Sequence, residues 1–191
     1  MDSSLNIILN ATNSLNFLIY LQNIYLNQNH RGRHLKYPYL STSISFKDDF
    51  DFEFKKLWNE VSQRICDDGG NDLHIFHHEK YVFYKKLFIS SVDSLKMYDE
   101  VYTAFQVWWS QYAGQFAIER SVDAPMHSLY HNLANLLKES KIEPKKYLNI
   151  SLIYDECLLV NNKISSNFGV LSIEHILSKH NQLSQKLKDS F

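Results

Sequence analysis

The chain has 191 residues, 45% of them hydrophobic, with 20 Lys or Arg against 21 Asp or Glu and a formal net charge of −1. This hydrophobic share is that of an ordinary globular protein and excludes a wholly disordered chain. Five Gly and three Pro exclude a collagen-like or low-complexity chain. Because the net charge is close to zero, only a local patch of charge could attract a nucleic acid or a membrane.

The length predicts one domain spanning residues 1–191. The two cysteines, Cys66 and Cys157, match neither a disulfide framework nor a metal-binding motif, so we expect free thiols in a reducing cytoplasm. The apolar stretch near the N-terminus lacks a basic start and is interrupted by Asn and Gln, which makes it neither a signal peptide nor a membrane span. We therefore expect a cytoplasmic protein without a membrane partner.

The first third of the chain is predicted to hold two helical regions separated by a loop and a short strand. Apolar spacing predicts helical structure over residues 5–27, divided near Asn10–Ser14 because Asn disfavours a helix interior. Gly and Pro predict a loop over residues 30–39, and alternating apolar residues predict a strand over Leu40–Phe46. An apolar stripe preceded by aspartates predicts a helix over Asp48–Cys66.

The middle of the chain combines an ambiguous segment with the strongest pattern of all. Leu73–Ser90 fits a helical spacing, but its content of Ile, Val, Phe and Tyr favours strands, and we expect strands. Nine large apolar residues then recur every three or four positions over Asp93–Phe116. They predict a long helix, capped by Asp93, that forms the centre of the core.

The last third is predicted to contain two helices around an extended segment. Asp123 and Pro125 are typical of the first turn of a helix. Alternation over Tyr147–Val160 predicts one long strand or a tight hairpin. Ser172 is the expected N-cap of a C-terminal helix, with apolar residues on both sides of the cap.

These elements together predict an α+β fold, predominantly helical, with about five helices. The small sheet is expected to be mostly antiparallel and to be formed by Leu40–Phe46, part of Leu73–Ile89 and Tyr147–Val160. The regular alternation of strands and helices that is typical of a doubly wound fold is missing, as is its glycine punctuation.

Two histidines provide the first candidate site. His127 and His131 are four residues apart on a predicted helix, so both imidazoles can project from one face and share a metal ion. Asp123, one turn earlier, is the candidate third ligand, and a metal-dependent hydrolase would be built on this group. The motif lacks the glutamate of HExxH, and the alternative is a pair of boundary histidines hydrogen-bonded to backbone or water.

The loop over residues 30–39 is the candidate site for a nucleic acid. Arg31, Arg33 and Lys36 could pair with phosphates, and Tyr37 could stack on a base. Three fixed cations are few for a non-specific nucleic-acid binder, and an acidic segment follows in the chain. A solvated loop and a protein contact are the alternatives.

The aromatic residues favour an interaction protein. Trp108 and Trp109 are adjacent and point about 100° apart on a helix, so both are buried only if the helix is covered over a wide arc. Central packing would cover them, and so would a dimer interface that includes Tyr112. Enzymatic motifs such as GxGxxG, GxxxxGK[ST] and GxSxG are missing. We therefore expect a non-catalytic homodimer without a cofactor, with a nucleic-acid accessory protein and a metal-dependent hydrolase as alternatives.

Overall fold

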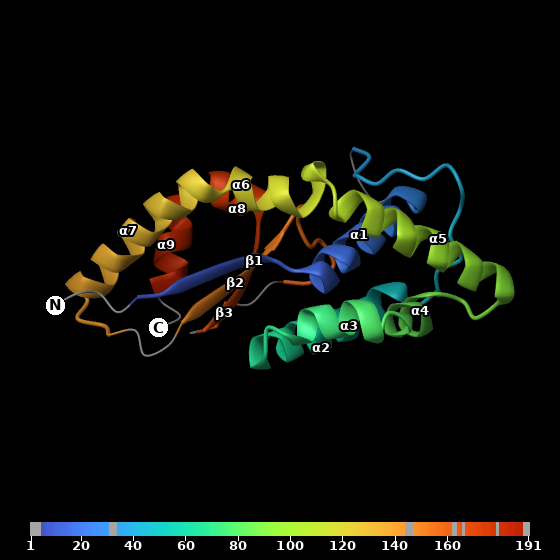
Figure 1. The fold of residues 1–191 in the computed structure, drawn as a ribbon, viewed down its shortest axis with the longest axis horizontal. Helices are drawn as coiled ribbons and strands as arrows, with labels where there is room; N and C mark the ends of the chain where they lie inside the picture. The colour runs from blue at the N-terminus through green and yellow to red at the C-terminus, as the bar shows by residue number, and fades with distance from the viewer. Residues whose placement is uncertain are drawn as a thin grey trace. The chain divides into compact units, whose positions relative to one another are not determined.

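The computed structural model describes residues 5–30, 34–143, 147–161, 164–165, 167–178 and 180–188 (Figure 1). The chain divides into two compact units. The helical unit comprises Asn13–Gln111 and Cys157–Val160, and the sheet unit comprises Met1–Thr12, Tyr112–Glu156 and Asn161–Phe191. A single domain over residues 1–191 stays a prediction.

The helical unit consists of α1 (Asn13–Gln28), α2 (Phe50–Asp67), α3 (Asn71–His78), α4 (Tyr81–Leu87) and α5 (Val92–Trp109). Helix α1 is buried on all sides from Ser14 to Leu26, because its apolar residues are distributed around the whole helix rather than along one stripe. The amides within it are buried as well. Gln22, for example, accepts hydrogen bonds from the backbone N–H groups of Leu158 and Leu159 at 2.8 and 3.3 Å.

Aromatic rings form the core of the helical unit. Phe17 of α1 lies at the centre of a cluster with ring centroids 5.1–6.2 Å apart, mostly in edge-to-face contact; the other rings are Phe76, Phe83, Tyr98, Tyr102 and Phe105. Such pairs contribute about 0.5–1.5 kcal/mol each beyond the area they bury. The cluster therefore holds α1, α3, α4 and α5 together.

Two of the expected strands are absent from the helical unit. Residues 73–89 form most of α3 and the whole of α4, which is the opposite of our expectation. Phe76 and Phe83 of this segment join the ring cluster around Phe17, and this tertiary packing overrides a weak strand propensity. The expected strand Leu40–Phe46 contributes only an isolated bridge between Phe46 and Phe88.

The sheet unit contains three parallel strands in the order β1 (Ile7–Ala11), β2 (Leu148–Ile153) and β3 (Phe168–Ser172). Its helices are α6 (Ala117–Ser121), α7 (Asp123–Glu139), α8 (Ile173–Ser178) and α9 (His180–Lys188), and a π-helical turn (Tyr112–Phe116) precedes α6. All five residues of β3 are buried. Helix α7 packs against α9 (Figure 1).

The α+β class is confirmed, but the antiparallel sheet and the number of helices are wrong. Every strand pair is parallel, and the described residues form more than the five helices we expected. Strand β1 lies within residues 5–27, where we expected only helix, and β3 lies outside every segment that we expected to be a strand. None of the described helices is long and apolar enough to cross a membrane.

Three predicted helices are confirmed in position. Helix α2 matches the expected Asp48–Cys66 within two residues, and α7 begins at Asp123. Ser172 caps α8 as expected, because its hydroxyl accepts a hydrogen bond from the N–H of His175 at 3.2 Å. The long helix expected over Asp93–Phe116 is shorter, since α5 runs from Val92 to Trp109.

Candidate functional site

Helix α5 has a buried face and an exposed face, and the exposed one is the candidate interaction site. Ser91 caps the helix by accepting a hydrogen bond from the N–H of Ser94 at 3.1 Å, rather than the expected Asp93. The buried face carries the aromatic residues of the core; they are Tyr98, Tyr102, Phe105 and Trp109. The long apolar pattern of the sequence thus describes contacts inside the unit.

The opposite face of α5 exposes apolar side chains to solvent. Val92 is 86% exposed, Leu95 36% and Val107 59%, and Thr103 and Ala104 lie exposed between them. With three charged residues these form what we call the α5 outer face, which consists of Val92, Leu95, Lys96, Asp99, Glu100, Thr103, Ala104 and Val107. Most of this face lines one shallow, wide-open depression of the surface. An apolar stripe along one exposed helix is typical of a surface that meets another protein.

The charges on the α5 outer face are arranged in order along the helix. Lys96 precedes Glu100 by four residues, so opposite charges are one helical turn apart. Asp99 is also paired with Lys80 of the loop before α4, whose Nζ lies 3.3 Å from its Oδ1. Along this side of α5, Lys96 therefore lies one turn before Glu100, and the exposed Asp93 lies one turn before Lys96.

The predicted interface residues Trp108, Trp109 and Tyr112 are only partly brought together. Trp109 is 4% exposed and stacks on Phe105 with ring centroids 5.3 Å apart, so its ring is already packed inside the helical unit. Trp108 is half-buried and lies 5.0 Å from the ring of Tyr37. Tyr112 is 82% exposed and belongs to the sheet unit.

The predicted nucleic-acid loop lies partly outside the described residues, which do not include Arg31 and Arg33. Lys36 and Tyr37 are held by amides of α1. The side chain of Asn27 donates to the carbonyl of Lys36 at 2.7 Å, and that of Asn23 donates to the carbonyl of Tyr37 at 2.8 Å. Burial raises the pKa of the Tyr37 hydroxyl. Hydrogen bonds from two side-chain amides of α1 to backbone carbonyls thus fasten this part of the loop to the helix.

The predicted metal ligands are divided between two separate contacts. The Nε2 atoms of His127 and His131 lie 3.2 Å apart on the exposed side of α7, so one imidazole donates a hydrogen bond to the other. Asp123 instead pairs with Arg120, whose Nη1 lies 2.8 Å from its Oδ2. Within the described ranges no group of three His, Cys, Asp or Glu side chains could hold a metal ion. A catalytic zinc site uses three protein ligands, and this arrangement provides two.

The thiol of Cys157 is held in its neutral form. Burial raises the pKa of the Cys157 thiol to about 12, and backbone hydrogen bonds from Val160 and Leu159 offset this only in part. Because the thiolate is the reactive form, this cysteine is poorly suited to nucleophilic catalysis at neutral pH.

No family model, curated protein or solved structure matches this chain. Function must therefore be inferred from its own residues.

Proposed function

We propose that this chain is a non-catalytic cytoplasmic protein that self-associates as a homodimer through the α5 outer face. The observation that supports the proposal is the exposed apolar stripe between Val92 and Val107 on a helix whose other face is fully packed. Burying such a stripe contributes roughly 25 cal/mol per Å² of apolar surface removed from water. Among the described residues neither cysteine forms a disulfide, which agrees with a reducing compartment.

The charges favour a second copy of this chain as the partner. When two α5 helices pack antiparallel about a two-fold axis near Tyr98, Lys96 of each copy lies opposite Glu100 of the other copy. The same arrangement places Val92 opposite Ala104. A parallel arrangement would instead bring Lys96 against Lys96, which is repulsive. The outer face is therefore self-complementary in one orientation only, as a two-fold interface requires.

The size of the face predicts a weak dimer. Helix α5 has 18 residues, and at 1.5 Å per residue it is about 27 Å long. A strip of that length and about 10 Å wide is well below the roughly 800 Å² per partner of a standard stable interface. We therefore expect a dissociation constant in the range of about 10–100 µM.

Charge reversal tests the proposed dimer most sharply. Lys96→Glu and Glu100→Lys each turn two attractive pairs into repulsive ones, which should weaken the dimer by about 2 kcal/mol, or roughly thirtyfold. The double variant Lys96→Glu/Glu100→Lys restores both pairs and should dimerise. An equimolar mixture of the two single variants should form a heterodimer for the same reason. Sedimentation velocity between about 5 and 300 µM brackets the expected dissociation constant.

The matched control is Lys55→Glu, which makes the same charge change at an exposed position of α2. It should leave the dissociation constant unchanged within about twofold. A chain that stays monomeric at the highest concentration contradicts the proposal. So does a Lys96→Glu variant that associates as well as Lys55→Glu, or a double variant that fails to recover.

A further inference from the structure

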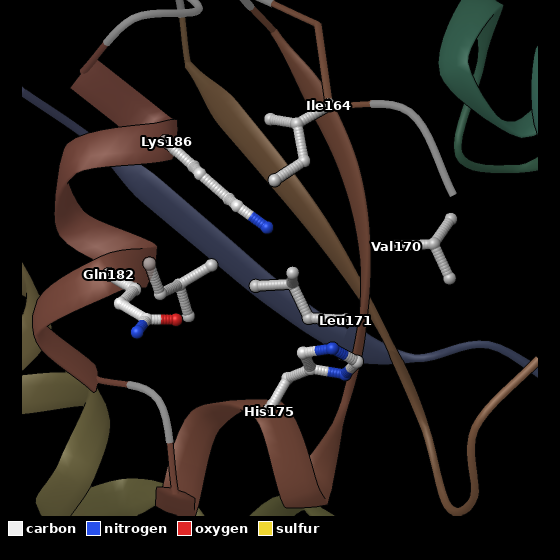
Figure 2. Close-up of a pocket in the computed structure, with 7 residues that line it drawn as sticks. Ile164, Val170, Leu171, His175, Gln182 and Lys186 are labelled. Carbon is white, nitrogen blue, oxygen red and sulfur yellow. The ribbon is translucent and has the colours of Figure 1, made fainter. Parts of the chain in front are cut away.

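The sheet unit contains a small pocket between β3, α8 and α9 (Figure 2). Its volume is about 90 Å³, roughly that of three water molecules in the liquid. The wall is mostly apolar and consists of Ile164, Val170, Leu171 and Leu183. Drug-sized ligands need about 300–1,000 Å³, so this pocket accepts only a few non-hydrogen atoms.

Three polar side chains converge on this apolar wall. Gln182 and Lys186 are one turn apart on α9, beside the buried Leu183 and Leu187 that anchor the helix. Figure 2 shows the Lys186 side chain extending from α9 into the space between Ile164 and Leu171. The Lys186 side chain is exposed and lines the pocket, so a ligand in the pocket can reach its ammonium group.

His175, the third polar group, is fixed in position by the start of α8. Its Nδ1 lies 2.7 Å from the hydroxyl of Ser172 and 3.7 Å from Oε1 of Glu156. The hydroxyl also accepts the N–H of His175, so it serves as the helix cap. Both partners are at the same ring nitrogen, whereas a catalytic triad uses the two nitrogens for different partners. This leaves Nε2 of His175 for a ligand rather than for activation of Ser172.

We propose that this pocket binds a small carboxylate with a short hydrocarbon chain of about two to four carbons. The ammonium of Lys186 pairs with the carboxylate, and the Gln182 amide and the His175 Nε2 supply hydrogen bonds. The hydrocarbon chain lies against Ile164, Leu171 and Leu183. Inorganic phosphate would also offer negative charge to Lys186, but it has no apolar part to lie against the wall.

Sodium butyrate is the probe, with n-butylamine and inorganic phosphate as comparisons at constant ionic strength. Amide chemical shifts in ¹⁵N spectra of the full chain report binding. Butyrate should shift the amide signals of Val170, Leu171 and Leu183 and bind with a dissociation constant of about 1 mM. Phosphate should bind at least about tenfold more weakly, because it leaves the apolar wall unfilled. The amine should not bind.

Two variants test whether the charge of Lys186 recognises the carboxylate. Lys186→Met keeps the length of the side chain and should weaken butyrate binding about tenfold. Gln182→Glu is isosteric and places a negative charge beside the ligand, so it should also weaken binding. Lys188→Met removes the same charge from the same helix outside the pocket and should change the affinity by less than about twofold. All three positions lie at or near the surface, so the variants should fold normally.

Several results would overturn the proposal. Equal binding of butyrate and n-butylamine would show an apolar hole without charge recognition. Tighter binding of phosphate would replace the carboxylate by a simple anion. Unaltered butyrate affinity in the Lys186→Met variant would show that there is no carboxylate site here. So would the absence of any amide shift at about 20 mM butyrate. The proposed dimer does not bear on these outcomes, because its residues belong to the helical unit.

Discussion

Asp72 should be one of the most sensitive positions of the helical unit, because it caps a helix distant in sequence. Its carboxylate is 6% exposed and accepts hydrogen bonds from the backbone N–H groups of Asn13 and Ser14 at 2.7 and 2.8 Å. The side-chain amide of Asn13 donates a third hydrogen bond to the same carboxylate, at 3.0 Å. These groups form the positive end of α1, where a negative charge is favourable. Asp72→Ala removes the acceptor and leaves the N–H of Ser14 buried without a partner.

The expected loss of stability for Asp72→Ala is about 3 kcal/mol. Losing a helix cap costs about 0.5–2 kcal/mol, and a buried donor left unpaired adds about 1–3 kcal/mol. Urea unfolding followed by tryptophan fluorescence is the assay, because Trp58, Trp108 and Trp109 all belong to the helical unit. With a urea m-value of about 2 kcal/mol/M, the midpoint should fall by about 1.5 M at constant m.

The matched control for this prediction is Asp68→Ala. The Oδ1 of Asp68 accepts only the local N–H of Gly70, at 2.9 Å and in solvent. Its removal should cost less than about 1 kcal/mol. Equal losses for Asp68→Ala and Asp72→Ala would refute the idea that the side chain of Asp72 holds the start of α1.

Two further predictions follow from shifted pKa values. The bidentate hydrogen bonds from Arg64 to Glu79, at 2.7 and 2.8 Å, lower the pKa of that carboxyl. The pair therefore stabilises the fold fully at pH values above about 4.3, the pKa of Glu in the unfolded chain. The stabilisation is lost as the pH falls through the lower pKa that Glu79 has in the folded chain. Because the pair is partly exposed, Glu79→Gln should lower the free energy of unfolding by about 1 kcal/mol at pH 7 and by much less at pH 3. Urea unfolding at the two pH values measures both losses. Equal losses would contradict the prediction. Cys157 has a pKa near 12, so at pH 8 it should react with iodoacetamide on the order of a thousandfold more slowly than a free thiol. Mass spectrometry of a Cys66→Ser variant measures this rate. Fast alkylation of the native chain would count against burial of the thiol.

Local signals located several helices but could not decide segments whose neighbours are distant. Helix α2 follows its expected range because one apolar stripe and an acidic first turn are both local features. Residues 73–89 carry the same kinds of side chains as a strand. Their helical form depends on Phe76 and Phe83 meeting Phe17, about sixty residues earlier in the chain. Such a contact has no local signature, and strand propensity is too weak to oppose it.

The parallel sheet shows the same dependence on long-range contacts. Ile7 pairs with Leu148, and β2 pairs with β3 across a connection that carries no helix of its own in the described residues. The sheet that we expected therefore paired segments that are not neighbours in the structure. The boundary between β1 and α1 falls at Asn13 because Asp72 caps it, a contact across 59 residues. The division that we expected near Asn10–Ser14 does fall there, although a strand rather than a helix precedes it, since β1 ends at Ala11 and α1 begins at Asn13. Within α1 itself, an amide such as that of Asn23 is a buried hydrogen-bonding group.

Helix α5 illustrates how hydrophobic spacing can identify a face without identifying what covers it. Its aromatic stripe requires burial, and either a second copy or another segment of the chain could provide it. Helix α1, buried on all sides, provides it here by contacting Phe105 through Phe17. The surface left for a partner is then the weaker stripe around Val92 and Val107, whose small side chains do not stand out in the sequence. Because the opposite charges of Lys96 and Glu100 lie within that weaker stripe, it is there that a symmetric partner gains both apolar contact and charge pairing.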